Sequence, residues 1–242
     1  MHQIRSFVCG QWTGTNSQTA DIVNPSTEEK IGEVLYGNLD TEAALDHARR
    51  VGGPALRAMT FAERGQLLLD LSSVIHGARE ELFTLAMQNG GNTRKDAKFD
   101  VDGAWQTLGY YGNLGLDLGH KRYFVDGEDV ALGRNPRLCA RHIWTPREGV
   151  AAHVNAFNFP AWGFAEKAAT TLLAGMPLLV KPATSTCLVA FRIMELLEES
   201  GKVPAGAVSM LIGGGRDLGS VLESQDVLAF TGGTSTAQMF RG

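Results

Sequence analysis

The sequence predicts an α/β fold with a doubly wound parallel sheet, preceded by a hairpin and a layer of helices. Strand-like and helix-like segments alternate from residue 149 onward, and polar residues stand where the strands end. The alternating segments are residues 150–154, 161–174, 178–181, 186–200, 207–212, 216–224, 227–230 and 234–241. We therefore divide the chain into residues 1–118, 119–145 and 146–242, and place the sheet in the last part.

The first 118 residues are predicted to form the hairpin and the helices. Apolar residues at 7–12 and 20–23, separated by polar residues and Gly14, predict the N-terminal hairpin. Helix-capping patterns predict one helix from Asp40 through Arg50, one from Thr60 with its capping-box partner Glu63 to about His76, and one from Thr93 to about Asn113. We expect these helices to pack on the sheet domain.

Residues 119–145 differ from the segments on either side. They are rich in charged residues, glycine and proline, and only 139–144 has the pattern of an extended strand. This part of the chain is therefore expected to lie outside both the helical layer and the sheet.

The composition excludes several classes of function. With 242 residues, 44% hydrophobic and 20% charged, the chain can bury a sizeable core. Its formal net charge of −4 gives no reason to expect nucleic acid or an anionic membrane as a partner. The apolar stretches are too short to span a bilayer, and the N-terminus lacks the apolar region of a secretion signal, so the expected location is cytoplasmic.

The cysteine and histidine patterns predict neither a disulfide framework nor a metal site. Cys9, Cys139 and Cys187 are far apart and form no CxxC pair, and the six histidines form no HExxH motif. Each cysteine is expected to be a buried or incidental thiol. Cys187 is the best placed for reactivity, because a helix N-terminus lowers the pKa of a thiol.

Two polar residues follow neighbouring predicted strands. Asn158 lies between a strand and a helix, where its side-chain NH2 can donate to an oxygen that gains negative charge during a reaction. Lys181 closes the next parallel strand and reaches the same edge of the sheet, where ligands bind in open α/β folds. The alternative interpretations are a turn asparagine and a surface lysine.

Two glycine-rich turns between strands and helices are candidates for binding phosphate groups. In both turns the backbone is bare and the N–H groups of the following helix are free. The first turn lacks the third glycine of a dinucleotide fingerprint and the lysine of a P-loop, so it is also compatible with an ordinary tight turn. The predicted cofactor-binding residues in the two turns are Gly213, Gly214, Gly215, Thr231, Gly232, Gly233 and Thr234.

Three motifs in this order resemble those of the aldehyde dehydrogenase superfamily. They are the segment Asn158-Phe159-Pro160, the segment Lys181-Pro182-Ala183 and the turn Phe230-Thr231-Gly232-Gly233, which has Gly233 in place of the usual serine. The resemblance implies a Rossmann-like nucleotide-binding core in residues 146–242 and an oligomerisation segment in residues 119–145, so a homo-oligomer is expected.

The resemblance also implies roles for individual residues. Asn158 is expected to be the oxyanion donor, and Lys167 to assist proton transfer or electrostatics in the same pocket. NAD-preferring members of the family carry a glutamate three residues after the lysine, where this chain has Thr184, so NADP is favoured over NAD. A hydroxyl of Ser185 or Thr186 is an alternative contact for the ribose. The other cofactor-binding residues implied are Asn155, Ala156, Phe157, Lys181 and Ala183.

Residues 52–64, 156–163 and 181–187 are similar to the branch of the family that acts on CoA-linked semialdehydes of aerobic phenylacetate or benzoate degradation. The phenylacetate enzymes are the first choice within it. The implied reaction is NAD(P)-dependent oxidation of an acyl-CoA semialdehyde to the acid through a cysteine thiohemiacetal. This chain has about half the family's length, so the catalytic cysteine and glutamate are expected beyond residue 242 and the chain alone is expected to be inactive. The alternative is a non-catalytic nucleotide-binding or assembly module.

Overall fold

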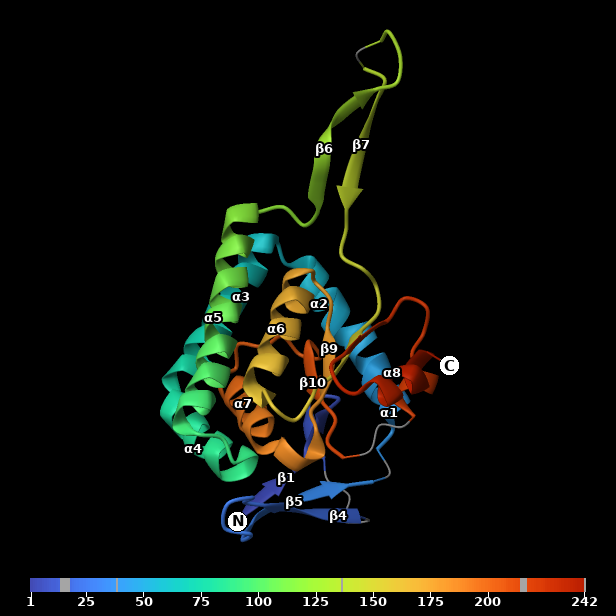
Figure 1. Ribbon diagram of the computed structural model, residues 1–242. Helices are drawn as coiled ribbons and strands as arrows, with labels where there is room; N and C mark the ends of the chain where they lie inside the picture. The colour runs from blue at the N-terminus through green and yellow to red at the C-terminus, as the bar shows by residue number, and fades with distance from the viewer. Residues whose placement is uncertain (14–17, 38, 136, 214–216, 242) are drawn as a thin grey trace.

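The computed structural model describes residues 1–13, 18–37, 39–135, 137–213 and 217–241 (Figure 1). The strands are β1 (His2–Ile4), β2 (Ser6–Val8), β3 (Gln11–Thr13), β4 (Gln18–Val23), β5 (Lys30–Tyr36), β6 (Phe124–Ala131), β7 (Cys139–Trp144), β8 (Ala151–Val154), β9 (Leu178–Lys181), β10 (Val208–Met210) and β11 (Val227–Phe230). The helices are α1 (Thr41–His47), the π-helix η1 (Ala48–Gly52), α2 (Gly53–Ala58), α3 (Phe61–Gly77), α4 (Arg79–Gly90), α5 (Arg94–Leu118), α6 (Pro160–Leu173), the 3₁₀ turn η2 (Thr184–Thr186), α7 (Leu188–Glu199), the 3₁₀ turn η3 (Leu218–Ser220) and α8 (Thr234–Arg241).

The central sheet confirms the predicted α/β class and contains both parallel and antiparallel strands. Its order is β11-β8-β9-β10-β2-β3, and the strands from β11 to β10 are parallel, whereas β2 and β3 are antiparallel to their neighbours. Residues 178–180 of β9 are all apolar, as expected for a strand that is covered on both faces. Leu178 and Val180 belong to the larger core cluster, and Leu179 belongs to a second cluster on the opposite face.

Helices cover both faces of this sheet. Helices α6 and α7 lie against one face and are backed by α3, α4 and α5, as Figure 1 shows. Helix α1 and η1 cover the other face, where Leu45 and Ala48 belong to the same buried cluster as Val150 and Leu179. Helices α3 and α5 can approach closely because Gly65 has no side chain. A Cβ there would lie 2.6 Å from the carbonyl oxygen of Gly112.

The predicted helix starts are confirmed, and two predicted ends are too early. The Oδ1 of Asp40 accepts from Ala43 N at 2.8 Å, and Thr60 and Glu63 form the full capping box. The first helix continues through η1 and α2 to Ala58. Helix α5 continues to Leu118, where the next residue, a glycine with positive φ, ends it. Helix α4 was not predicted, and no side chain caps its N-terminus.

Two predicted elements are wrong. Residues 7–12 form a hairpin by themselves, β2 and β3, because Cys9 and Gly10 adopt positive φ in a tight turn, and β4 pairs with β5 instead. Of the predicted helix 216–224, the described part forms only η3. In this segment Val221 O accepts from Arg49 Nη2 at 3.4 Å, and Glu223 N donates to Asp226 Oδ2 at 2.8 Å, so these two backbone groups bond to side chains.

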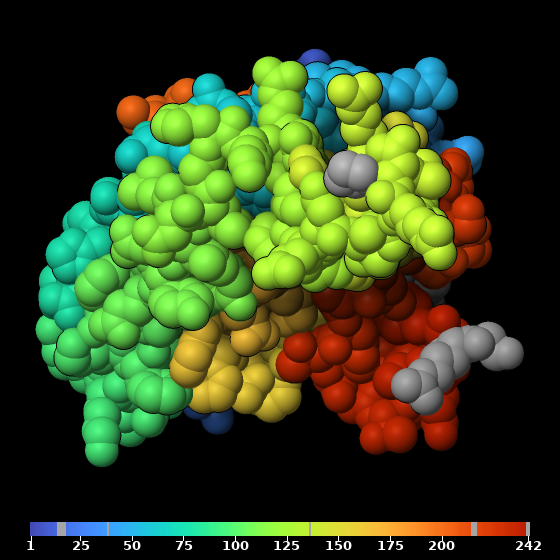
Figure 2. Space-filling view, turned by 90° about the horizontal axis from the view of Figure 1, so that it is seen from above, coloured from blue at the N-terminus to red at the C-terminus, as the bar shows by residue number. Residues whose placement is uncertain are grey.

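Strands β6 and β7 form an antiparallel arm that extends away from the body of the molecule (Figure 1). Seen from above, the arm overlies the top of the molecule between α5 and the C-terminal segment (Figure 2). Arg141 donates to both carboxylate oxygens of Asp129, each at 2.6 Å, and joins the two strands. Among the described residues, no helix is long and apolar enough to cross a membrane.

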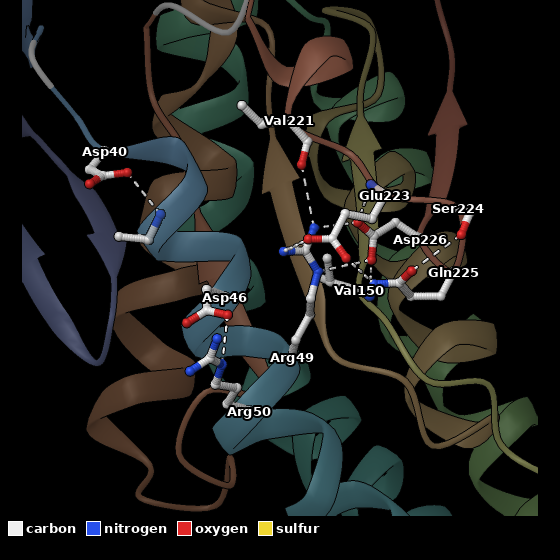
Figure 3. Close-up of polar contacts among 11 residues, drawn as sticks. Asp40, Asp46, Arg49, Arg50, Val150, Val221, Glu223, Ser224, Gln225 and Asp226 are labelled. Atoms are coloured by element: carbon white, nitrogen blue, oxygen red, sulfur yellow. Dashed lines mark hydrogen bonds and ion pairs between the residues drawn. The ribbon is translucent and has the colours of Figure 1, made fainter.

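A buried ion pair fixes the start of β11. Arg49 on η1 reaches across to the carboxylate of Asp226, whose Oδ1 also accepts from Val150 N at 2.9 Å (Figure 3). The Oδ2 of Asp226 accepts from Glu223 N at 2.8 Å. Gly149 is required beside this pair, since its φ is +117° and a Cβ there would lie 2.6 Å from Gln225 O. The pair therefore sets the position of β11 beside β8.

Replacing Asp226 by asparagine is expected to destabilise the fold by about 3 kcal/mol, because it removes the buried carboxylate partner of Arg49 and leaves only the exposed Glu223, whose Oε1 lies 3.4 Å from Arg49 Nη1. Burial raises the pKa of Asp226, but hydrogen bonds from Arg49 and the backbone outweigh it and lower the pKa below its usual value. The stabilisation is therefore present at neutral pH and is lost as the pH falls through the acidic range. Urea unfolding from pH 7 to pH 3 tests this.

The matched control is Asp46→Asn, which removes an exposed ion pair with Arg50 at 2.8 Å on the same helical segment. That variant should lose less than about 1 kcal/mol and keep the pH dependence of the parent chain. Equal losses in the two variants would contradict the proposed importance of the Arg49–Asp226 pair.

Candidate functional site

The candidate site lies where β8, β9 and β11 end at one edge of the sheet. These strands are neighbours and parallel, so their carboxyl ends face the same crevice. A cavity of about 510 Å³ opens there. Of the residues predicted to bind the cofactor, Asn155, Ala156, Phe157, Lys181, Ala183, Thr231, Gly232 and Gly233 line it.

A second cavity of about 230 Å³ adjoins the first and contains both predicted catalytic residues, Asn158 and Lys167. The two cavities share Ala156, Asn158 and Thr231 as lining residues. A ligand in the larger cavity and a reacting group in the smaller one would therefore meet at Asn158. The side chain of Asn158 is exposed to this space.

Lys181 ends β9 and is partly desolvated in the wall of the larger cavity. Burial lowers the pKa of its ammonium group, and no carboxylate of the described residues pairs with it. Its backbone carbonyl accepts from Asn155 N at 3.0 Å, which joins the ends of β9 and β8. A desolvated ammonium without a charge partner is suited to bind an anionic group of a ligand.

Lys167 lies on α6 with only 11% of its side chain exposed. Its ammonium group contacts Glu166 Oε1 at 3.1 Å and the carbonyl oxygen of Gly163 at 3.5 Å. The structure thus places Lys167 in the same cavity as Asn158 and gives it a carboxylate partner, Glu166, which also lines that cavity.

Thr186 is not a free ribose contact, because its hydroxyl donates to Phe157 O at 2.8 Å. This bond ties η2 to the loop that carries Asn158. On the other side of η2, the buried side chain of Asn89 donates to Ser185 O at 2.8 Å and accepts from Leu188 N at 3.1 Å. The segment that includes Thr184 is therefore held from two directions.

The described part of the first glycine-rich turn has a packing role. Gly213 has a φ of +86°, and a Cβ there would lie 2.5 Å from the Cβ of Tyr36. Gly214 and Gly215 lie outside the described residues. Of the predicted cofactor-binding residues that are described, Thr184, Gly213 and Thr234 do not line the 510 Å³ cavity.

The second glycine-rich turn leads into α8 beside the larger cavity. Thr231 N donates to Val154 O at 2.9 Å, which holds the turn against β8. A Cβ on Gly233 would meet no atom within 4 Å, so the family's serine would fit at this position. Thr234 begins α8 and lines an adjoining cavity of about 450 Å³.

A groove of about 550 Å³ lies beside the smaller cavity, between α5 and α6, and Trp162 lines both. Phe99 packs edge-on against Trp162, with ring centroids 5.2 Å apart, and the indole N–H donates to Thr107 Oγ1 at 3.1 Å. Lys95 and Gln106 provide polar groups at the groove. No local sequence pattern predicts this groove, because it depends on two helices whose contacting residues are more than 50 positions apart.

Two buried polar residues near the site were also missed. Asp100 accepts from the backbone N–H of Ala161 and Trp162 at the start of α6, and Asn89 holds the segment before α7. Burial raises the pKa of Asp100 to about 6, although the two N–H donors act in the opposite direction. For Asp100 the available signal was a polar residue at a buried position of the predicted helix that begins at Thr93, whereas Asn89 lies on α4, which was not predicted.

The three cysteines are buried to different degrees. Cys187 is fully buried, and this burial raises the pKa of its thiol to about 12, so its place at the start of α7 does not activate it. Cys9 lies in the β2–β3 turn, and Cys139 is exposed on the arm. The described residues contain no group of three or more histidine, cysteine, aspartate or glutamate side chains placed to hold a metal ion.

Similarity to known proteins covers nearly the whole chain. A model of the aldehyde dehydrogenase family matches residues 12–240. The 3,4-dehydroadipyl-CoA semialdehyde dehydrogenase of Aromatoleum evansii is 40% identical over 239 residues, which are 99% of this chain and 46% of that protein. Aldehyde dehydrogenase 1A1 of Equus caballus is 30% identical over 244 residues, which are 97% of this chain and 46% of that protein.

Solved structures agree with this similarity. A betaine aldehyde dehydrogenase double mutant of Staphylococcus aureus, in complex with NAD+, has a TM-score of 0.81 at 27% identity over 99% of this chain and 48% of that one. An NADP-dependent enzyme of E. coli has a TM-score of 0.84 at 27% identity, over 99% and 49% of the two chains. The chain spans about half the length of the relatives it matches. The extent of the family match and the 40% identity to one member show that this chain belongs to the aldehyde dehydrogenase family.

Proposed function

We propose that this chain binds a nicotinamide dinucleotide at the edge of its sheet and supplies the oxyanion donor for oxidation of an aldehyde. One observation carries the proposal: the cavity that contains Lys181 and the cavity that contains Asn158 and Lys167 meet at shared residues. When bound, the nicotinamide accepts a hydride from the substrate. A cofactor in the larger cavity and an aldehyde in the smaller one would then be neighbours.

Asn158 is proposed to donate a hydrogen bond to the aldehyde oxygen as a nucleophile adds to the carbonyl carbon. The oxygen gains negative charge in that step, and one such donor lowers the barrier by roughly 3 kcal/mol. Lys167, whose ammonium group lies in the same cavity, adds a positive charge near the reacting group. Neither the role of Asn158 nor that of Lys167 requires its side chain to gain or lose a proton.

The cofactor-binding residues fit a phosphate-bearing ligand. Lys181 offers a cation without a carboxylate partner among the described residues, and the turn before α8 offers backbone N–H groups at the N-terminus of a helix. Thr184 is uncharged where an acidic residue would repel a 2′-phosphate. We therefore propose NADP as the preferred cofactor, with NAD as the weaker ligand.

A CoA-linked semialdehyde is the proposed substrate. The 40% identical relative is named for such a substrate, 3,4-dehydroadipyl-CoA semialdehyde. The 550 Å³ groove shares Trp162 with the Asn158 cavity. Its lining combines the rings of Phe99 and Trp162 with polar and charged side chains, namely Lys95, Asp96, Lys98, Asp102, Gln106 and Thr107. Such a groove suits a long, amide-bearing chain attached to the aldehyde. The relative's name favours a dicarboxylic acyl-CoA semialdehyde of the 3,4-dehydroadipyl type.

The β6–β7 arm is proposed to join two or more copies of the chain. Exposed apolar side chains gather on it, including Val130, Ile143 and Trp144, with exposed fractions of 51%, 52% and 65%. Apolar patches of this kind mark protein interfaces. The segment 119–145 would thus serve as the oligomerisation element.

The Lys181→Ala variant is expected to bind NADP roughly 10- to 100-fold more weakly, because it removes a charge-assisted hydrogen bond. Isothermal titration calorimetry with NADP and NAD measures this. Lys202→Ala, which removes an exposed lysine on the far side of α7, is the control and should leave both affinities unchanged. Loss of NADP affinity in both variants, or in neither, would count against the assignment of Lys181.

The Thr184→Glu variant tests the cofactor preference. The new carboxylate should weaken NADP binding about tenfold or more by repelling the 2′-phosphate, while NAD binding is kept or improved. The ratio of the two affinities is the measurement, so NAD serves as the internal control. An unchanged ratio would show that Thr184 does not face the 2′ position.

The Phe99→Ala variant is expected to weaken binding of a dicarboxylic acyl-CoA thioester roughly 3- to 10-fold, because it removes one aromatic wall of the groove. Quenching of tryptophan fluorescence reports the binding through Trp162. Tyr110→Ala, an exposed ring farther along α5, is the control. Equal effects from the two variants would exclude this groove as the site of the acyl-CoA chain.

The Trp144→Glu variant is expected to shift the oligomer toward smaller species in light scattering coupled to gel filtration, because the charge lies in the proposed interface. Val51→Glu, on the η1 side of the molecule, is the control. A variant at position 144 that keeps the parent's mass would refute the role of the arm.

A further inference from the structure

Helix α6 begins at residues that cannot cap it themselves. Phe159 occupies the N-cap position without a capping side-chain bond, and Pro160 has no backbone N–H. Gly163 N already donates to Phe159 O at 2.8 Å. The donors of the first turn that need a partner are therefore those of Ala161 and Trp162. They come directly after the loop that carries Asn158.

The carboxylate of Asp100 accepts both of these hydrogen bonds. Ala161 N donates to Oδ2 at 3.1 Å, and Trp162 N donates to Oδ1 at 2.7 Å. Asp100 belongs to α5 and is fully buried, so the cap of α6 comes from a different helix. A carboxylate at this end of the helix also interacts favourably with the helix dipole.

The same stretch of α5 holds the rings that flank this cap. Phe99 packs edge-on against Phe159, with ring centroids 6.0 Å apart, and against Trp162. Gly103 makes room for the indole, since a Cβ there would lie 2.7 Å from Trp162 Cδ2. Phe99, Asp100, Gly103 and Thr107 of α5 thus together contact Phe159 and Trp162, which follow Asn158 in the chain.

The location of Phe159 explains why the cap of α6 comes from outside the loop that carries Asn158. A serine or aspartate at position 159 would cap α6 locally, but that position holds an aromatic ring that lines the 230 Å³ cavity. The cavity wall and the helix cap cannot both be provided by one side chain. Asp100 separates the two tasks.

We propose that Asp100 is a positioning residue for Asn158: by holding the N–H groups of Ala161 and Trp162, it fixes the start of α6 and the direction in which the Asn158 side chain enters the cavity. The importance of this for catalysis rests on the proposed role of Asn158 as oxyanion donor. The positioning itself is independent of that role and can be measured without any aldehyde or cofactor.

The test is Asp100→Asn in the uniformly 15N-labelled 242-residue chain, with the NH2 resonances of Asn158 assigned by their loss in Asn158→Ala. An asparagine keeps one acceptor and turns its NH2 toward the second backbone donor. We expect the Asn158 resonances to shift, and the backbone amide of Ala161 or Trp162 to exchange with solvent roughly 10- to 100-fold faster. Asp117→Asn removes an exposed carboxylate at the end of α5 and should change neither signal.

Each outcome decides the proposal. Faster exchange at Ala161 or Trp162 with unshifted Asn158 resonances would make Asp100 a helix cap without influence on the site, and would overturn the inference. No change in either signal would also overturn it. If Asp100→Asn does not fold, the parent chain still provides a test, because the first-turn amides of Ala161 and Trp162 must be protected from exchange there. Rapid exchange of both would refute the proposed hydrogen bonds.

Discussion

The arrangement of the site depends on a buried carboxylate at the start of one helix. Asp100 reaches from α5 to the first turn of α6 and satisfies two backbone N–H groups that have no partner in their own helix. Burial of this carboxylate is unfavourable, which is why its pKa is raised to about 6. The two hydrogen bonds that Asp100 accepts compensate for the cost of burying its charge, and they fix the helical layer to the loop that carries Asn158.

Polar side chains from the first half of the chain hold the second half at three separate points. Asp100 acts on α6, Asn89 acts on the segment before α7, and Arg49 acts on β11 through Asp226. Asp100 and Asn89 bind backbone groups at strand-to-helix junctions beside the candidate site, whereas Arg49 binds Asp226 at the start of β11, the opposite end of that strand from the site. Loops that carry functional residues are thereby held by rigid elements, which limits their motion and preserves the shape of the cavities.

The two cavities have different chemical character, and this suits two different ligands. The larger one combines a lysine without a carboxylate partner among the described residues with a glycine-rich helix start, as a phosphate-bearing cofactor requires. The smaller one combines an amide, a lysine and aromatic walls, as a carbonyl group with an apolar chain requires. Asn158 lies at the boundary, so the orientation of a single side chain links the two sites.

The sequence alone determined the features that depend on near neighbours. The capping box of Thr60 and Glu63 starts α3, and the apolar runs that precede Asn158 and Lys181 put both residues at one edge of a parallel sheet. Tertiary structure decided the rest. Three features depend on partners 29 to 172 residues away. They are the hydrogen bond of the Thr186 hydroxyl, the absence of a long helix in the described residues 217–224, and the cap of α6. Local periodicity and capping rules contain no information on such pairs, because the contacts exist only once the two halves of the chain have packed together.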